Sequence, residues 1–283
     1  MSVETKRILI SGANGGLGLS SVTFLIKEGY TVFALDITTE CLETLAASLP
    51  AEGDDNHGGK LIILKADLTD SASLQSAFSE VKKHTESLDA VISIAGNMAI
   101  GSLIEQDAEL MQKVINVTFM GCVRLYGTFF PLVETAGGRF VTITSEYAVL
   151  DSLPFHGFYT AAKHALKAYS DSLRRELQFL NIKVVEVRPG AFATPMQGGI
   201  QDRFAHILND TKHYKLQLTK MKAMMDKELL KAKDPAIFVK TLYKAVSSKH
   251  PKRCYCVHNS FKMRCLSVLP AAMQDKILKL LFS

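Results

Sequence analysis

From residue 6 to residue 190, short runs of apolar and β-branched residues alternate with longer segments of helical periodicity. The expected strands are Arg7–Ser11, Thr31–Asp36, Lys60–Lys65, Asp89–Ile94, Arg139–Ser145 and Lys183–Arg188. The expected helices lie near residues 16–28, 39–48, 71–84, 107–132 and 158–180. Apolar strands that alternate with amphipathic helices are typical of a parallel sheet with helices on both faces.

Local signals support these boundaries. Gly29 is placed to end the first helix, and Asp70 or Ser71 can cap the third helix at its start. Because crossovers between parallel strands are almost always right-handed, the pattern predicts an α/β fold with a doubly wound, Rossmann-like sheet. Ligands bind such sheets at the carboxyl ends of the strands, so functional residues are expected there.

The pattern changes after Gly190. Residues 191–233 are rich in Met, Phe, Lys and Gln and contain no expected strand, which predicts a helical lid over the edge of the sheet. A helix from about Asp234, a short strand Cys254–Val257 and an amphipathic helix over about 261–282 follow. We therefore expect residues 1–283 to form a single Rossmann-like domain with a substrate lid at about 191–233.

Composition narrows the class of protein. With 47% hydrophobic and 22% charged residues among 283, the chain is expected to bury a sizeable core. The sequence shows no secretory signal and no apolar run long enough for a transmembrane helix. Its five cysteines are scattered and odd in number, which fits a reduced, cytoplasmic setting. Cys254-x-Cys256 lacks a second pair, so we expect ordinary strand cysteines and no metal.

The net charge of +5 is local in origin. Residues 212–253 contain twelve Lys or Arg and three Asp or Glu, a balance of +9 that leaves −4 for the rest. A nucleic-acid surface is one explanation, but interleaved aromatic residues and a known binding motif are absent. A solvated helical face is favoured, and no nucleic-acid partner is expected.

A glycine-rich turn follows the first expected strand. Gly12 permits a tight turn, Gly16 lets the backbone approach a pyrophosphate, and Gly18 permits close packing of helix on strand. We also expect Asn14 and Leu17 of this turn to contact the cofactor. Glycine turns also occur for packing alone, but a strand before and a helix after favour dinucleotide binding.

Residues at the next strand ends extend this site. Asp36 can accept both ribose hydroxyls of NAD and would repel the extra phosphate of NADP; the alternative is that it caps the following helix. Asp67 and Leu68 lie where a side chain could reach the adenine. Ala95 and Gly96 would let the backbone approach the cofactor.

Tyr159 and Lys163 stand four residues apart on one face of an expected helix. A free tyrosine has a pKa near 10, and an ammonium one turn away and the helix N-terminus both favour its phenolate. We therefore expect the pKa of Tyr159 to be lowered. Ser145 ends the preceding strand and can hydrogen-bond a substrate oxygen. These residues are candidates for acid/base catalysis.

Together these motifs resemble the short-chain dehydrogenase/reductase family along essentially the whole chain. The matching elements are Gly12-x-x-x-Gly16-x-Gly18, Asp67-Leu68, Ala95-Gly96, Asn116, Ser145, Tyr159-x-x-x-Lys163, Arg188-Pro189-Gly190 and Thr194.

The resemblance implies a role for each catalytic residue. Tyr159 would be the acid/base, Ser145 would steady the reacting oxygen, and Lys163 would lower the tyrosine pKa and hold the nicotinamide ribose. Asn116 would hold a water in the proton relay. The nicotinamide would be lined by Pro189, Gly190 and Thr194. The resemblance also implies a homodimer or homotetramer.

Two departures from the family pattern stand out. Ser93-Ile94-Ala95-Gly96 replaces the usual Asn-Asn-Ala-Gly. Ser145 lies fourteen residues before Tyr159, one more than is usual, so either a loop insertion keeps Ser145 in place or Glu146 occupies the serine position. We favour the insertion.

The last segment is similar to the branch that includes hydroxysteroid and retinol dehydrogenases. The apolar face of its amphipathic helix is interpreted as a core or oligomer contact in preference to a peripheral membrane contact; it comprises Leu266, Leu269, Met273, Ile277 and Leu280.

An apolar substrate, steroid-, retinoid- or lipid-like, is expected from the side chains of the lid and of the approach to Tyr159. These are Phe192, Met196, Ile200, Leu218, Met221, Met224, Met225, Leu153, Phe155 and Phe158. The alternative is that they only pack the lid onto the sheet. The sequence thus predicts an NAD-dependent oxidoreductase acting on a secondary alcohol or ketone. The alternatives are an epimerase or dehydratase on the same fold, and a non-catalytic NAD sensor or scaffold.

Overall fold

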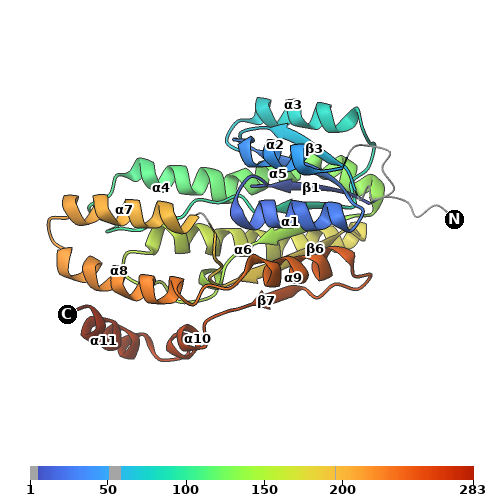
Figure 1. The fold of residues 1–283 in the computed structure, drawn as a ribbon. Coiled ribbons are helices and arrows are strands. Elements are labelled where there is room, and N and C mark those ends of the chain that lie inside the picture. The colour runs from blue at the N-terminus through green and yellow to red at the C-terminus, as the bar shows by residue number, and fades with distance from the viewer. Residues whose placement is uncertain (1–5, 51–58, 195) are drawn as a thin grey trace.

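The computed structural model describes residues 6–50, 59–194 and 196–283, with residues 196–202 described by backbone alone. Its centre is a sheet of seven parallel strands in the order β3-β2-β1-β4-β5-β6-β7 (Figure 1). The strands are β1 (Arg7–Ser11), β2 (Thr31–Asp36), β3 (Leu61–Lys65), β4 (Ala90–Ser93), β5 (Arg139–Ile143), β6 (Lys183–Pro189) and β7 (Cys254–Val257). The predicted doubly wound α/β sheet is confirmed.

Helices cover both faces of the sheet because alternate strand residues point to opposite sides. Ile8 and Ile10 of β1 face a core made with α1 (Gly16–Lys27), α2 (Glu40–Ser48) and α9 (Pro235–Ser247). Leu9 faces the opposite core, made with α3 (Ser71–Lys82), α5 (Gly121–Ala136) and α6 (Gly157–Leu177). The fully buried strands explain the continuous apolar runs in the sequence.

The predicted end signals are confirmed. Gly29 has a φ of 83° just after α1, in the left-handed region that glycine adopts without strain. Asp70 caps α3, its Oδ1 accepting from the amide of Ala72 at 2.9 Å. Asp234 caps α9 in the same way, through the amide of Ala236 at 2.7 Å.

The single helix predicted over 107–132 is wrong. The segment is divided into α4 (Ala108–Ile115), one turn of π-helix (Asn116–Met120) and α5. The widened turn packs beside the loop after β3, where a Cβ on Gly121 would lie 3.0 Å from the Cβ of Leu68. Such π-helical turns are frequent at functional sites.

Two further helical segments lie beyond the carboxyl end of the sheet. Helices α7 (Met196–Asp210) and α8 (Lys215–Leu229) form the segment predicted as a lid, and a bridge between Phe192 and Lys233 closes its base. The helix predicted over 261–282 is broken into α10 (Phe261–Ser267) and α11 (Ala271–Phe282), because Pro270 between them lacks an amide hydrogen. Figure 1 shows α11 beside α8, outside the layered body. Within the described ranges, none of these helices is both long and apolar enough to cross a bilayer.

Candidate active site

The glycine-rich turn between β1 and α1 is held by close backbone contacts. Gly12 has a φ of 73°, and a Cβ there would lie 2.6 Å from the amide nitrogen of Ala95. A Cβ on Gly18 would lie 1.9 Å from the carbonyl oxygen of Gly12. These contacts confirm the packing roles predicted for Gly12 and Gly18. Leu17 packs against the core on the α1 side.

Helix α1 begins at Gly16 after Gly15, and among the described residues no side chain caps its first amides. Free amides and the positive end of the helix dipole favour an anion at this position. The glycine turn therefore has the geometry and charge that a dinucleotide pyrophosphate requires.

Asp36 lies at the end of β2 and turns toward the glycine-rich turn. Its Oδ2 accepts from the amide of Asn14 at 2.9 Å, and its Oδ1 accepts from the amide of Ile37 at 2.8 Å. The alternative that Asp36 caps α2 is wrong, because the Asn14 side chain caps that helix through the amides of Cys41 and Leu42. A carboxylate has about four lone-pair positions, so Asp36 keeps capacity to accept from a ribose.

Asn14 differs from the expectation in one respect. Its Oδ1 caps α2 and its Nδ2 donates to the hydroxyl of Thr38 at 2.9 Å. With its side chain engaged in this way and its amide donating to Asp36, Asn14 has its backbone carbonyl oxygen left for a cofactor.

The ends of β3 and β4 approach the same edge of the sheet. Asp67 Oδ1 accepts from the amide and hydroxyl of Thr69, and the Leu68 side chain is buried in the core. After β4, a Cβ on Gly96 would lie 3.6 Å from Lys163 Nζ. Gly96 therefore joins the cofactor side of the site to the catalytic side.

Thr118 is a residue that the sequence reasoning missed. It lies in the π-helical turn, is fully buried, and its hydroxyl accepts from the amide of Asn97 at 3.1 Å. A Cβ on Gly96 would meet the Thr118 side chain at 3.4 Å. A lone threonine in an apolar helix gave no sequence signal for this contact.

The structure brings Tyr159, Lys163 and Ser145 together. Tyr159 and Lys163 lie in the first turns of α6, with Lys163 Nζ 5.8 Å from the centre of the Tyr159 ring. Lys163 is buried and donates to the carbonyl of Ile143 at 3.1 Å. Ser145, just after β5, hydrogen-bonds the Tyr159 side chain. The turn that carries Asn116 packs against α6.

The expected lowering of the Tyr159 pKa is wrong for this structure. Burial raises the pKa of Tyr159, the hydrogen bond from Ser145 opposes the rise, and the charge of Glu146 adds to it. Burial also lowers the pKa of Lys163, to about 8. Loss of solvent outweighs the hydrogen bond with Ser145, so the protonated phenol of Tyr159 is favoured at neutral pH.

The contacts of Ser145 and Glu146 show which of the two residues lies at the serine position of the site. Ser145 is the residue that meets Tyr159, whereas Glu146 Oε2 accepts from the amide of Ser260 at 2.6 Å. Burial raises the pKa of the Glu146 carboxyl. Glu146 thus ties the loop after β5 to the start of α10, and it is Ser145 that hydrogen-bonds Tyr159.

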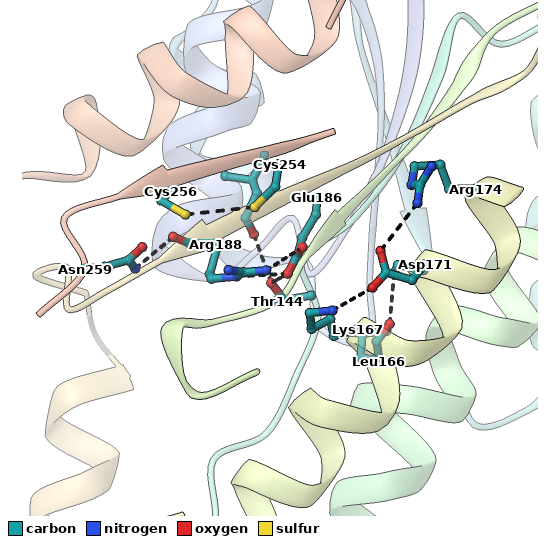
Figure 2. Close-up of polar contacts among 12 residues, drawn as sticks. Thr144, Leu166, Lys167, Asp171, Arg174, Glu186, Arg188, Cys254, Cys256 and Asn259 are labelled. Atoms are coloured by element: carbon teal, nitrogen blue, oxygen red, sulfur yellow. Dashed lines mark hydrogen bonds and ion pairs between the residues drawn. The ribbon is translucent and has the colours of Figure 1, made fainter. Parts of the chain in front are cut away.

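A buried polar network supports this loop from β6 (Figure 2). The Thr144 hydroxyl donates to Glu186 Oε1 at 2.6 Å, and Arg188 Nη2 donates to Glu186 Oε2 at 2.8 Å. The Arg188 carbonyl accepts from Asn259 Nδ2 at 3.0 Å. The free thiols of Cys254 and Cys256 lie on β7, with their Sγ atoms 4.0 Å apart.

The segment expected to line the nicotinamide begins where β6 ends. A Cβ on Gly190 would lie 2.0 Å from the carbonyl oxygen of His258, so only glycine fits there. Pro189 is the last residue of β6, and Thr194 lies four residues beyond Gly190, half-buried, just before α7.

An apolar cavity of about 280 Å³ lies between the approach to Tyr159, α8 and α11. Its apolar wall includes Phe155, Tyr214, Leu278 and Phe282, and Asp275 and Lys279 stand among its polar lining residues. Phe155 has a φ of 66°, a rare conformation that directs the backbone before α6. His156 is buried against Tyr147, with ring centroids 5.2 Å apart, and Tyr147 in turn contacts Tyr159.

The lid side chains divide into two groups. Phe192, Leu218 and Met221 are buried. These three side chains therefore pack the lid onto the rest of the domain, which is the alternative to contact with a substrate. Met224 is 38% exposed. The side chains of Met196 and Ile200 lie outside the described residues.

In a comparison with known proteins, the matching family and the relatives given below are all named as dehydrogenases. A family profile described as short chain dehydrogenase matches residues 6–204. A probable short-chain type dehydrogenase/reductase of Helicobacter pylori is 32% identical over 182 residues, which span 64% of this chain and 63% of that protein, just under two thirds of its length. Estradiol 17-beta-dehydrogenase 2 of Rattus norvegicus is 27% identical, over 100% of this chain and 76% of the relative. Retinol dehydrogenase 5 of Homo sapiens is 28% identical, over 96% and 87%.

Solved structures share the fold. A short-chain dehydrogenase/reductase of Burkholderia phymatum in complex with NAD superposes with a TM-score of 0.73 at 20% identity, over 91% of this chain and 90% of that one. An alcohol dehydrogenase of Thermococcus sibiricus complexed with 5-hydroxy-NADP gives 0.71 at 19% identity, over 90% and 96%. These neighbours therefore include both an NAD and an NADP-type complex.

Proposed function

This chain belongs to the short-chain dehydrogenase family, a family of nicotinamide-dependent oxidoreductases, and we propose that it uses NAD to interconvert a secondary alcohol and a ketone. The observation that carries the proposal is the meeting of Ser145, Tyr159 and Lys163 at the end of β5. This group lies across Gly96 from the glycine-rich turn.

The residues present fit a dinucleotide. The turn at Gly12 and Gly18 has no room for side chains, the uncapped first amides of α1 could donate to an anion, and Asp36 would accept from the ribose. Leu17, Asp67, Leu68 and Ala95 would line the adenine side, and Pro189, Gly190 and Thr194 the nicotinamide side. The bound nicotinamide supplies the hydride chemistry, and the protein supplies orientation and proton transfer.

Tyr159 would exchange the proton with the substrate oxygen. Because burial raises its pKa, Tyr159 is protonated and poised as the acid for ketone reduction. Ser145 would hold the same oxygen, and buried Lys163 would orient the cofactor ribose. Asn116, in the π-helical turn, would hold a water that passes a proton from solvent back to Tyr159.

Asp36 favours NAD over NADP. The extra phosphate of NADP would meet its carboxylate, and the following residues, Ile37 and Thr38, offer no positive charge. Ile37 is uncharged and 57% exposed, so the position directly after Asp36 is open to solvent.

The proposed substrate is apolar, of steroid, retinoid or lipid size. The likeness to proteins named as estradiol and retinol dehydrogenases supports this. The apolar cavity beside Phe155 lies near the approach to Tyr159, although none of Ser145, Tyr159 and Lys163 lines it. We further propose a cytoplasmic homodimer or homotetramer, which light scattering on the purified protein would test.

One screen tests the proposal as a whole. Secondary alcohols and ketones, from short chains to steroids, are assayed by nicotinamide absorbance with NAD(H) and NADP(H) in parallel. The expected result is turnover of bulky apolar substrates with NAD(H). Cofactor binding without turnover of any member would contradict the assignment, and faster turnover of short polar alcohols would contradict the substrate class.

A further inference from the structure

Helices α10 and α11 carry an apolar surface that no described part of the chain covers. Five large apolar side chains point into solvent within 21 residues: Phe261 (78% exposed), Val268 (81%), Met273 (50%), Leu280 (79%) and Leu281 (48%). We call these five residues the outer face. Single exposed apolar residues are ordinary, but a group of this kind marks an interaction site.

The outer face is not needed for folding the segment, because other residues attach it. Phe282 is buried and packs against Phe155, with ring centroids 6.3 Å apart. Gln274 is buried and its Nε2 donates to Asp151 Oδ2 at 2.7 Å. These contacts fix the inner side of α11, and Figure 1 shows the segment at the outside of the molecule, beside α8.

The charges around the outer face have one dominant sign. The segment from residue 261 to residue 283 contains four basic residues, Lys262, Arg264, Lys276 and Lys279, and one acidic residue, Asp275. All five are exposed. Lysine and arginine beside an exposed apolar stripe match a surface that is apolar within and anionic at its boundary.

A second copy of the chain fits this surface less well. A two-fold interface places the same patch against itself, so the basic side chains would face one another and repel. An anionic bilayer instead attracts each basic residue, by about a factor of five in affinity for each one near the surface.

We propose that the outer face docks on the surface of an anionic lipid membrane, with α10 and α11 lying in the plane of the interface. Phe261, Val268 and Leu280 enter the boundary between headgroups and acyl chains, and the lysines contact lipid phosphates. No described helix is long and apolar enough to span the bilayer, so this contact is peripheral. The proposal does not depend on the catalytic assignment.

Vesicle cosedimentation tests the proposal with the full chain. Vesicles contain phosphatidylcholine alone or with about a third phosphatidylserine. The expected result is binding to the anionic vesicles, at least about tenfold stronger than to neutral ones, and weakening as salt rises because the charges are screened. Failure to sediment with anionic vesicles at low salt would overturn the proposal.

Variants separate the two components. Phe261→Ser with Leu280→Ser should weaken binding at least about tenfold, since two apolar side chains no longer leave water. Lys262→Ala with Lys276→Ala should weaken it about twenty-five-fold. The matched control is Phe179→Ser, which removes a side chain that is 81% exposed at the far end of α6 and should leave binding unchanged.

Light scattering on the same proteins tests the competing occupant. The proposal expects Phe261→Ser with Leu280→Ser to keep the oligomeric state of the wild type. If that variant dissociates a dimer while vesicle binding is unaffected, the outer face is an interface between copies and the proposal is wrong.

Discussion

The two sides of the candidate active site are built by different means. On the cofactor side, backbone meets backbone: a Cβ on Gly12 would lie 2.6 Å from the amide nitrogen of Ala95, and one on Gly18 1.9 Å from a carbonyl oxygen. On the substrate side, side chains make the contacts, such as Glu146 with Ser260 and Phe155 with Phe282. Backbone contact admits few sequences, whereas side-chain contact can be rebuilt with other residues. The cofactor side can therefore be predicted from the sequence, whereas the substrate side can be built from different residues.

The largest expected effect lies where the two sides meet. Tyr159→Phe should lower kcat at least about 10²-fold and up to about 10⁴-fold, because the phenol transfers the proton. Its affinity for NADH should stay within about threefold, since a hydroxyl used for proton transfer adds little to cofactor binding. Steady-state kinetics and fluorescence titration measure the two quantities.

Tyr147→Phe is the control, because Tyr147 contacts the Tyr159 ring without a proposed chemical role. It should keep kcat within about threefold. A Tyr159→Phe enzyme that retained more than about a tenth of the activity would refute the acid/base assignment.

The second effect tests whether Ser145 or Glu146 contacts the reacting oxygen on the substrate side. Ser145→Ala should lower kcat about 10²-fold to 10³-fold, because it removes a donor to the reacting oxygen. Glu146→Gln should change kcat only mildly, since the Glu146 carboxylate accepts a hydrogen bond from the amide of Ser260, just before α10. The reverse ranking would place Glu146 at the oxygen.

The same contrast explains how far the sequence could be interpreted. All seven strands were predicted within about two residues of their ends. Buried strands appear in a sequence as apolar runs, and the ends of helices are marked by capping residues such as Gly29 and Asp70. The π-helical turn was not predicted, since the sequence Asn116–Met120 has the pattern of an ordinary helix and no local residue marks the change. The bond from Ser260 to Glu146 joins residues 114 positions apart, and no local pattern encodes such a contact.

Among the glycines, Gly18 and Gly127 give a stability test of the cofactor side. Gly18→Ala should destabilise the fold by about 3 kcal/mol, because its Cβ would overlap the carbonyl of Gly12. Gly127→Ala, in the middle of α5 with open space around its Cβ, should stabilise by about 0.5–1 kcal/mol. Urea denaturation measures both. Equal effects would show that the turn can relax.

His156 gives a pH test of the substrate side. Burial lowers its pKa from 6.5 to about 4, and a hydrogen bond to the Pro154 backbone opposes the shift only in part. The unfolded chain binds a proton below pH 6.5 and the folded chain only near pH 4. Stability present above pH 6.5 is therefore lost as the pH falls through this window, by about 2–3 kcal/mol.

His156→Phe should flatten the loss of stability between pH 7 and pH 4.5, measured by urea denaturation at each pH. The control is His250→Phe, an exposed position where the wild-type pH dependence should persist. If both variants follow the wild-type curve, buried His156 does not govern acid stability.

The smallest expected effect is cofactor choice, and it tests the charge of Asp36 on the cofactor side. Wild type should prefer NAD(H) to NADP(H) at least about tenfold in kcat/KM. Two like charges about 4 Å apart near a protein surface repel by roughly 4 kcal/mol, and a third of that, after screening by solvent, corresponds to about one decade. Asp36→Ala with Ile37→Arg should shrink or reverse the preference.

Asp36→Asn is the matched control, because it removes the charge while keeping an oxygen that can accept from the amide of Asn14. If the preference depends on charge, Asp36→Asn should lose most of it without loss of stability. Wild type that used both cofactors equally would show that the Asp36 carboxylate does not face the ribose, and its bonds to Asn14 and Ile37 would then be its whole role.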